Sequence, residues 1–188
     1  MVNTANRPKP KVAIFGGSFD PPHRGHQTIV QKSVKGLNVD KIIVLPAYLN
    51  PFKSSSLASP KQRLAWCHKL FGNISNVIVS DYEINKNRSV KTSQSVKYFN
   101  IEFDVKYLII GSDNLSTITS WHEFDFLNNN IEWVIFTRNG YPIDTEKLKK
   151  FKVIQLNEDA NSTDIRDKKA LIYIDNKIEN SVKQIIKG

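Results

Sequence analysis

The chain has 188 residues, of which 40% are hydrophobic and 24% charged, as in ordinary globular proteins and unlike disordered ones. This length suits one compact domain, and the longest apolar runs are too short to span a bilayer. Lys and Arg outnumber Asp and Glu by 27 to 18, which gives a formal net charge of +9. That charge suits either a nucleic-acid-binding protein or an enzyme with polyanionic substrates, and composition alone does not separate the two classes.

Residues 1–10 are polar, contain two prolines and lack the apolar core of a signal peptide. We expect them to form a flexible tail, followed by a single domain over residues 11–188 that ends in a helical segment. Cys67 is the single cysteine of the chain, which excludes an internal disulfide and fits a reducing compartment. We therefore expect a cytoplasmic protein that does not bind membranes.

Short apolar runs alternate with helical patterns along the chain. The runs predict strands at residues 11–15, 41–45, 77–79, 107–110, 132–136 and 153–156. Helical spacing and capping residues predict helices at 25–34, at 60–71 after a Ser59 cap, from a Thr92 or Ser93 cap to about 101–103, and at 121–127, 144–151, 163–171 and 176–187. This alternation predicts an α/β, Rossmann-like, doubly wound sheet of about six mostly parallel strands with helices on both faces. Ligands bind such sheets at the carboxyl ends of the strands.

The first predicted strand ends in the sequence G-G-S-F-D-P-P-H-R-G-H, residues 16–26. Gly16 and Gly17 let the backbone approach a ligand closely. His23 and His26 are three residues apart, so they share one face at the start of the following helix, where free N–H groups and the helix dipole attract an anion. The pattern predicts a phosphate site, although it is neither a Walker loop nor a dinucleotide fingerprint.

This segment resembles the histidine signature G-x-F-D-P-x-H-x-G-H of the nucleotidyltransferase superfamily. Three further motifs follow predicted strands: I-I-G-S-D-N-L at residues 109–115 with Trp121, T-R-N-G-Y-P at 137–142, and S-T-D-I-R at 162–166. In this order they are similar to motifs of the bacterial nicotinate-nucleotide adenylyltransferases. The resemblance implies transfer of AMP from ATP to nicotinate mononucleotide, giving the deamido dinucleotide and pyrophosphate in NAD biosynthesis.

The resemblance also implies roles for individual residues. It assigns catalysis to His23, His26, Lys53 and Arg166, and ATP binding to Gly16, Gly17, Ser18, Phe19, His23, His26, Gly111, Asp113, Arg138, Ser162, Thr163 and Arg166. It assigns the pyridine nucleotide to Lys53, Lys91, Thr92 and Trp121. Mg²⁺ is expected to arrive with the ATP, because no cluster in the sequence has the spacing of metal ligands.

Several of these residues also have simpler interpretations. Asp113 could accept hydrogen bonds from ribose hydroxyls or only cap the next turn, and Arg138 could hold a phosphate or pair with a surface acid. Trp121 could face a pyridine ring or belong to the core. Ser162 or Thr163 is expected to cap the helix that carries Arg166. His68 and His122 lie outside the motifs and are interpreted as surface or packing residues.

Two departures from the family pattern leave the acceptor open. The N-P-P-H-K motif of the family is N-P-F-K at residues 50–53, which keeps Lys53 but loses an imidazole. The S-Y-T motif is V-K-T at residues 90–92, where Lys91 offers a cation for a pyridine carboxylate or simply faces solvent. Both changes weaken the preference for nicotinate over nicotinamide mononucleotide.

Other functions remain as alternatives. Phosphopantetheine adenylyltransferases and cytidylyltransferases share the histidine signature, and the oligomeric state is open. A nucleic-acid-binding module would use the high charge, with clusters at Lys147, Lys149, Lys150, Lys152, Lys168 and Lys169. Acidic residues lie beside these lysines, so a solvated helix face is the default interpretation.

Overall fold

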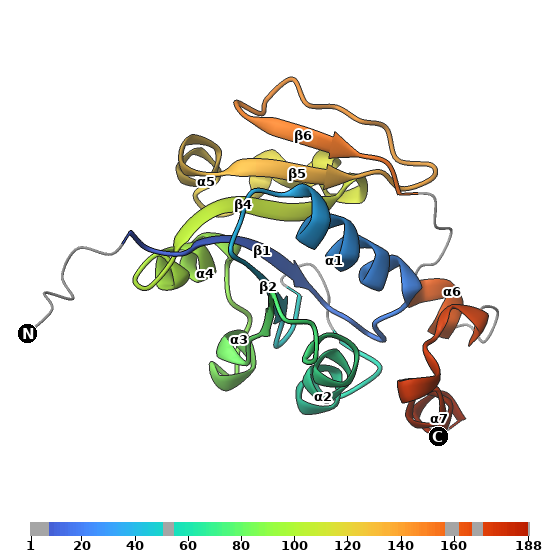
Figure 1. Ribbon diagram of the computed structural model, residues 1–188. Helices are drawn as coiled ribbons and strands as arrows, with labels where there is room; N and C mark the ends of the chain where they lie inside the picture. The colour runs from blue at the N-terminus through green and yellow to red at the C-terminus, as the bar shows by residue number, and fades with distance from the viewer. Residues whose placement is uncertain (1–7, 51–54, 157–161, 167–170, 188) are drawn as a thin grey trace, which may run out of the picture.

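The core of the protein is one parallel sheet, seen in a computed structural model that describes residues 8–50, 55–156, 162–166 and 171–187. Its strands are β1 (Lys11–Gly17), β2 (Lys41–Pro46), β3 (Val77–Val79), β4 (Asp104–Gly111), β5 (Glu132–Phe136) and β6 (Phe151–Ile154). They lie in the order β3-β2-β1-β4-β5-β6, and every neighbouring pair is parallel (Figure 1). The expected α/β, Rossmann-like sheet is confirmed.

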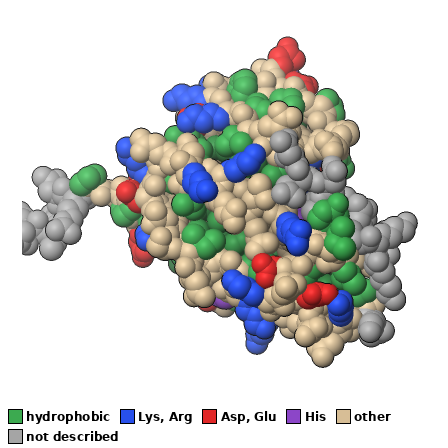
Figure 2. Space-filling model, turned by 45° about the vertical axis from the view of Figure 1, so that its right-hand side comes forward, with side chains coloured by type: hydrophobic (Ala, Val, Ile, Leu, Met, Phe, Trp, Pro, Cys, Tyr) green, Lys and Arg blue, Asp and Glu red, His purple; other side chains and the backbone are tan. Residues whose placement is uncertain are grey.

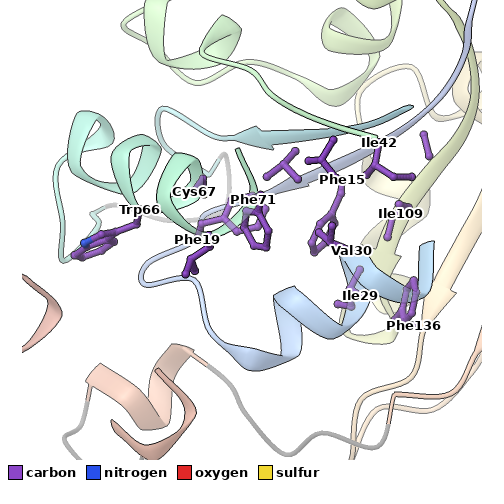
Figure 3. Packing of buried hydrophobic residues seen from close by; sticks show 14 of the residues in the cluster. Phe15, Phe19, Ile29, Val30, Ile42, Trp66, Cys67, Phe71, Ile109 and Phe136 are labelled. Carbon is purple, nitrogen blue, oxygen red and sulfur yellow. The ribbon is translucent and has the colours of Figure 1, made fainter. Parts of the chain in front are cut away.

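Helices cover both faces of this sheet. They are α1 (Arg24–Gly36), α2 (Pro60–Phe71), α3 (Tyr82–Asn85), α4 (Thr92–Phe99), α5 (Phe124–Asn130), α6 (Ser162–Arg166) and α7 (Asn176–Lys187), with 3-10 turns at Ser112–Ser120 and Leu171–Tyr173. One buried cluster joins β1 to α1, α2 and α7, and Figure 3 shows Phe15, Phe19, Val30 and Phe71 meeting in it. A second cluster packs α4 and α5 on the opposite face. Because the central strands are buried on both sides, they are continuous apolar runs in the sequence.

The sheet has one topological switch point. Chain order runs outward from β1 through β2 to β3, and then from β4 through β5 to β6 on the other side. In open parallel sheets the crevice beyond the carboxyl ends at such a point is the usual ligand site. The residues that end β1 and β4 therefore lie at the expected ligand site.

Several local predictions differ from the structure. The helix expected at 144–151 is absent: the Asn128 side chain bonds the backbone of Lys147 and Lys149, and the Lys150 carbonyl accepts from Trp133, so these groups are not free for a helix. The last strand is Phe151–Ile154, two residues earlier at both ends than the expected 153–156.

The other differences concern helix ends. The stretch predicted at 121–127 becomes a helix only from Phe124, because Glu123 has a left-handed φ of 55°. Helix α4 is capped by Lys91 rather than by Thr92 or Ser93, and it ends at Phe99. The helix expected over 163–171 is described only as α6 and a 3-10 turn at 171–173, since 167–170 lie outside the described residues. Helix α3 was not predicted.

Two general features complete the description. In the ranges that the structure covers, no helix has the length and apolarity needed to cross a membrane. Figure 2 shows the molecule turned so that the carboxyl ends of the strands come forward. Lys and Arg side chains lie in small separate groups across this surface.

Candidate active site

His23 and His26 lie together at the start of α1, beside the end of β1. His23 is the N-cap residue, and its backbone N–H donates to Nδ1 of His26 at 3.2 Å. The two ring centroids are 3.9 Å apart, and the two residues are only 2% and 7% exposed. The spacing of the signature therefore does place both imidazoles at one helix N-terminus, as expected.

Burial sets the protonation of this pair. It lowers the pKa of His23 to about 3, with the positive charge of Arg138 as a second cause. The pKa of His26 is also far below its usual value, first through burial and then through His23 and Arg138. Both rings are thus neutral at physiological pH, and because Nδ1 of His26 accepts a hydrogen bond, the proton of that ring is on Nε2.

The ring of His23 has an unusual surrounding. Both of its nitrogens are buried, and neither has a hydrogen-bond partner within the described part of the chain. Buried polar atoms are nearly always satisfied, and an exception calls for an explanation such as a catalytic role or a bound ion or water. The imidazole is therefore suited to bind a group that enters from outside the protein.

The turn between β1 and α1 is tightly held. A Cβ on Gly17 would lie 3.2 Å from the Phe19 ring, so glycine lets the turn close over this side chain. Phe19 itself is buried with a left-handed φ of 49°. The carboxylate of buried Asp20 accepts from the N–H groups of Leu57 and Ala58 at 2.8 and 2.9 Å.

The carboxyl-terminal part of the chain also contacts this turn. Arg166 Nη1 donates to the Asp20 carbonyl at 2.8 Å, and the Ser162 hydroxyl donates to the Pro21 carbonyl at 3.1 Å. Ser162 is the first described residue of α6, and its hydroxyl is bonded to the turn. The expectation that Ser162 or Thr163 caps this helix stays a prediction, because residue 161 lies outside the described residues. The side chain of Thr163 lies outside the described residues. These contacts place the guanidinium of Arg166 next to the histidine signature.

The end of β4 brings Asp113 and Arg138 together. Arg138 Nε lies 3.2 Å from Asp113 Oδ1, and the Arg138 backbone N–H donates to the Ser112 hydroxyl at 2.9 Å. Arg138 was expected either to hold a phosphate or to pair with a surface acid. The structure shows it paired with an acid, Asp113, which lies at the switch point of the sheet. A Cβ on Gly111 would come within 2.3 Å of Asp113 Oδ1 and 2.7 Å of Arg138 Nε, so a glycine here leaves room for the pair.

The residues expected to bind a pyridine nucleotide form a second group. Lys91 and Thr92 begin α4, and the neighbouring Ser93 hydroxyl lies 3.0 Å from Nδ1 of His122, directly after Trp121. The contact brings the turn of Trp121 next to the start of α4. Trp121 packs edge-on against Trp133 at 6.1 Å, and its buried Nε1 has no partner among the described residues.

No hydrogen bond or ion pair between described residues joins this second group to the histidine pair. Lys53, which is expected both to take part in catalysis and to bind the pyridine nucleotide, lies outside the described residues. His68 and His122 are exposed, in agreement with their interpretation as surface residues.

Arg63 in α2 is the main residue that the sequence analysis missed. It is fully buried, and its guanidinium donates to four backbone carbonyls of the strand-end segments. Its spacing from Cys67 and Leu70, four and seven residues on, places it on the buried stripe of a helix, where an arginine is out of place. That position is the signal that would have found it.

The carboxylates near the histidine pair have partners within the protein. In the described ranges, no three His, Cys, Asp or Glu side chains gather as metal ligands. The Asp20 carboxylate is engaged by two N–H groups, and that of Asp113 by Arg138. Both carboxylates are therefore already engaged by groups of the protein.

Comparisons with known proteins agree on one family. A family model described as cytidylyltransferase-like matches residues 14–168. A probable nicotinate-nucleotide adenylyltransferase from Sulfurovum sp. is 62% identical over 182 residues, 97% of each chain. One from Campylobacter jejuni is 40% identical over 176 residues, 93% of this chain and 95% of the relative.

Solved structures show the same fold. The nicotinic acid mononucleotide adenylyltransferase of Plasmodium falciparum, complexed with NaAD, superposes with a TM-score of 0.71 at 22% identity, covering 93% of this chain and 89% of that one. Its complex with APC gives a TM-score of 0.69 at 21% identity, with 95% of each chain covered. At these identities the likeness concerns the fold alone.

Proposed function

Because the chain belongs to the family of the nicotinate-nucleotide adenylyltransferases, within the cytidylyltransferase-like proteins, we propose that it transfers AMP from ATP to nicotinate mononucleotide. A phosphate oxygen of the mononucleotide attacks the α-phosphorus of ATP. A new phosphorus–oxygen bond forms, the bond between the α-phosphorus and the bridging oxygen breaks, and pyrophosphate leaves. The product is nicotinate adenine dinucleotide, an intermediate of NAD biosynthesis.

The neutral histidine pair is the observation that carries this proposal. The nucleophile is already an anion, so the reaction needs no general base, only positioning and stabilisation of charge. Two buried, uncharged imidazoles at a helix N-terminus supply N–H donors for phosphate oxygens at low cost in reorganisation. We assign Nε2–H of His26 and the unpartnered ring of His23 to the phosphates of ATP.

The two arginines supply the positive charge that the histidines lack. Arg138 lies close enough to lower the pKa of both imidazoles, and Arg166 is anchored on the turn that carries them. We assign both guanidinium groups to the phosphate chain, where charge grows on the leaving pyrophosphate. When bound with ATP, Mg²⁺ neutralises further phosphate charge.

The acceptor is assigned to the second group of residues. Trp121 offers a ring face and Lys91 an exposed cation near the start of α4. A pyridine carboxylate is the acceptor group that a cation would favour, so nicotinate mononucleotide is preferred to nicotinamide mononucleotide. Lys53 is assigned to the mononucleotide phosphate from its motif alone.

The experiment is a pyrophosphate-release assay with ATP and nicotinate mononucleotide, nicotinamide mononucleotide or phosphopantetheine as acceptor. We expect nicotinate mononucleotide to give the highest kcat/KM. His26→Ala should lower kcat by about 10²-fold, the typical worth of one charge-stabilising donor, while far-ultraviolet circular dichroism stays unchanged.

The exposed His68 provides a matched control, because His68→Ala removes an imidazole outside the site and should keep the wild-type kcat. A preference for phosphopantetheine would contradict the proposed acceptor. Normal turnover by His26→Ala would contradict the role of the histidine pair.

A further inference from the structure

Arg63 is a buried cation without a carboxylate in direct contact among the described residues. Its Nη1 donates to the carbonyls of Ser18 and Ala47 at 2.6 and 2.7 Å, and Nη2 donates to that of Tyr48 at 2.6 Å. Its Nε donates to the carbonyl of Ala58 at 3.2 Å. Burial lowers the pKa of Arg63 while the nearby charge of Asp20 opposes this, and an arginine stays protonated even so.

The four carbonyls belong to three different segments of the site. Ser18 is in the turn after β1, Ala47 and Tyr48 follow β2, and Ala58 precedes α2. The backbone pairing of the first two segments ends where Ala47 N–H donates to the Gly17 carbonyl at 2.9 Å. Beyond that point the guanidinium takes over the role of the sheet ladder, because it binds carbonyls of both segments.

This arrangement matters most for Phe19, the next residue of the turn. A non-glycine residue with φ of 49° is strained, and it persists only where its surroundings fix it. Arg63 holds the Ser18 carbonyl before it, and the Asp20 carboxylate is tied to Leu57 and Ala58 after it. In a trans peptide the N–H points away from the C=O, so Arg63 also turns the Phe19 N–H to the side opposite the guanidinium.

We propose that Arg63 is a positioning residue, which sets the backbone of the Gly17–Phe19 turn for binding and reaction of ATP. It acts through the turn and does not itself touch the substrate. This role rests on the proposed assignment of the turn to ATP, but not on the identity of the acceptor.

Arg63→Lys tests the proposal, because lysine keeps the charge but cannot reproduce a planar fork over four carbonyls. We expect the dissociation constant of ATP, measured by calorimetry, to rise about tenfold and kcat to fall about tenfold, since small misplacements of a binding group are costly. The KM for the mononucleotide should change less than about threefold. A purely structural role would lower Tm and leave ATP binding by the folded protein unchanged.

Arg88→Lys is the matched control. Arg88 is exposed and donates to the neighbouring Ser89 carbonyl, so this variant should keep wild-type ATP binding and kcat. Wild-type ATP affinity and kcat in a folded Arg63→Lys protein would overturn the proposal.

If Arg63→Lys does not fold, Asp20→Asn decides, because it weakens the other hold on Phe19 while preserving shape. Weaker ATP binding would support the proposal, and wild-type binding would overturn it. If the wild type binds ATP but transfers AMP to none of the acceptors, the proposed function fails, while calorimetry still decides the role of Arg63.

Discussion

The burial of the histidine pair has two consequences, one for the charge of the site and one for stability in acid. Burial keeps His23 and His26 uncharged, the state in which we propose that they donate to phosphate, and the same burial penalises the folded protein in acid. In the native state His23 binds a proton only near pH 3, whereas in the unfolded chain it does so near its usual pKa of 6.5. The unfolded state therefore binds more protons between these values, and stability is lost as the pH falls through that window.

We predict that the free energy of unfolding of the ligand-free protein falls by about 2 kcal/mol between pH 7 and pH 5 on account of His23 alone. His26 acts in the same direction. Urea unfolding at both pH values measures the loss, and His23→Asn should reduce it by about that amount. His68→Asn, which changes an exposed imidazole, should keep the wild-type loss. Equal losses in wild type and His23→Asn would mean that His23 is not shielded from water.

At the residue scale, the sequence was sufficient to locate the histidine pair but not to reveal the contacts of Arg63. His23 and His26 follow a strand at a spacing that by itself places both on one helix end. The partners of Arg63 are backbone carbonyls of Ser18, Ala47 and Tyr48, and a carbonyl is present at every residue, so no pattern of side chains identifies them. Only the folded geometry shows which carbonyls meet.

At the scale of elements, close contacts make the end of β4 sensitive to substitution. Gly111 is the last residue of that strand, and its missing side chain leaves the space in which Asp113 meets Arg138. The atoms nearest a new Cβ are the ends of two flexible side chains and not backbone. A larger residue at this position would therefore disturb the site before it disturbed the sheet.

We predict that Gly111→Ala lowers kcat/KM for ATP by about tenfold or more, because it pushes Asp113 and Arg138 apart. Both side chains are 31% exposed, so the loss of their ion pair should cost less than about 1 kcal/mol of stability. Steady-state kinetics and thermal unfolding together check this. Gly36→Ala is the control, since a Cβ there meets nothing within 4 Å. An unchanged kcat/KM for ATP would show that the pair is not needed.

At this scale, buried elements could be predicted from the sequence more accurately than exposed ones. The central strands are apolar on both faces and were located within a few residues, as for 41–45 in Lys41–Pro46. The stretch 144–151 is mostly exposed and rich in lysine, which suits a solvated helix equally well. Its path is held by distant partners, the Asn128 side chain on Lys147 and Lys149 and the Trp133 N–H on the Lys150 carbonyl, and these contacts leave no trace in the local sequence.

At the scale of the whole molecule, the net charge of +9 does not gather into one patch on the face that carries the strand ends. Figure 2 shows separated basic side chains over the surface seen with the strand ends turned forward. The cations assigned to the phosphates are a few arginines held by specific contacts, such as Arg138 on Asp113 and Ser112. The remaining lysines contribute a diffuse field, which attracts anionic nucleotides weakly and is screened by salt.

The lysines of the irregular segment before β6 test whether surface lysines contribute only a diffuse field. We predict that replacing Lys147, Lys149 and Lys150 with Gln leaves kcat unchanged and alters the KM for ATP by less than about twofold at ~0.15 M salt, where the Debye length is about 8 Å. At low salt the KM should rise more clearly, because steering by distant charges is then stronger. A large loss of kcat in this variant would place the segment in the active site. Salt-dependent binding of random DNA by the wild type, abolished in the variant, would instead revive a role for this surface in binding nucleic acid.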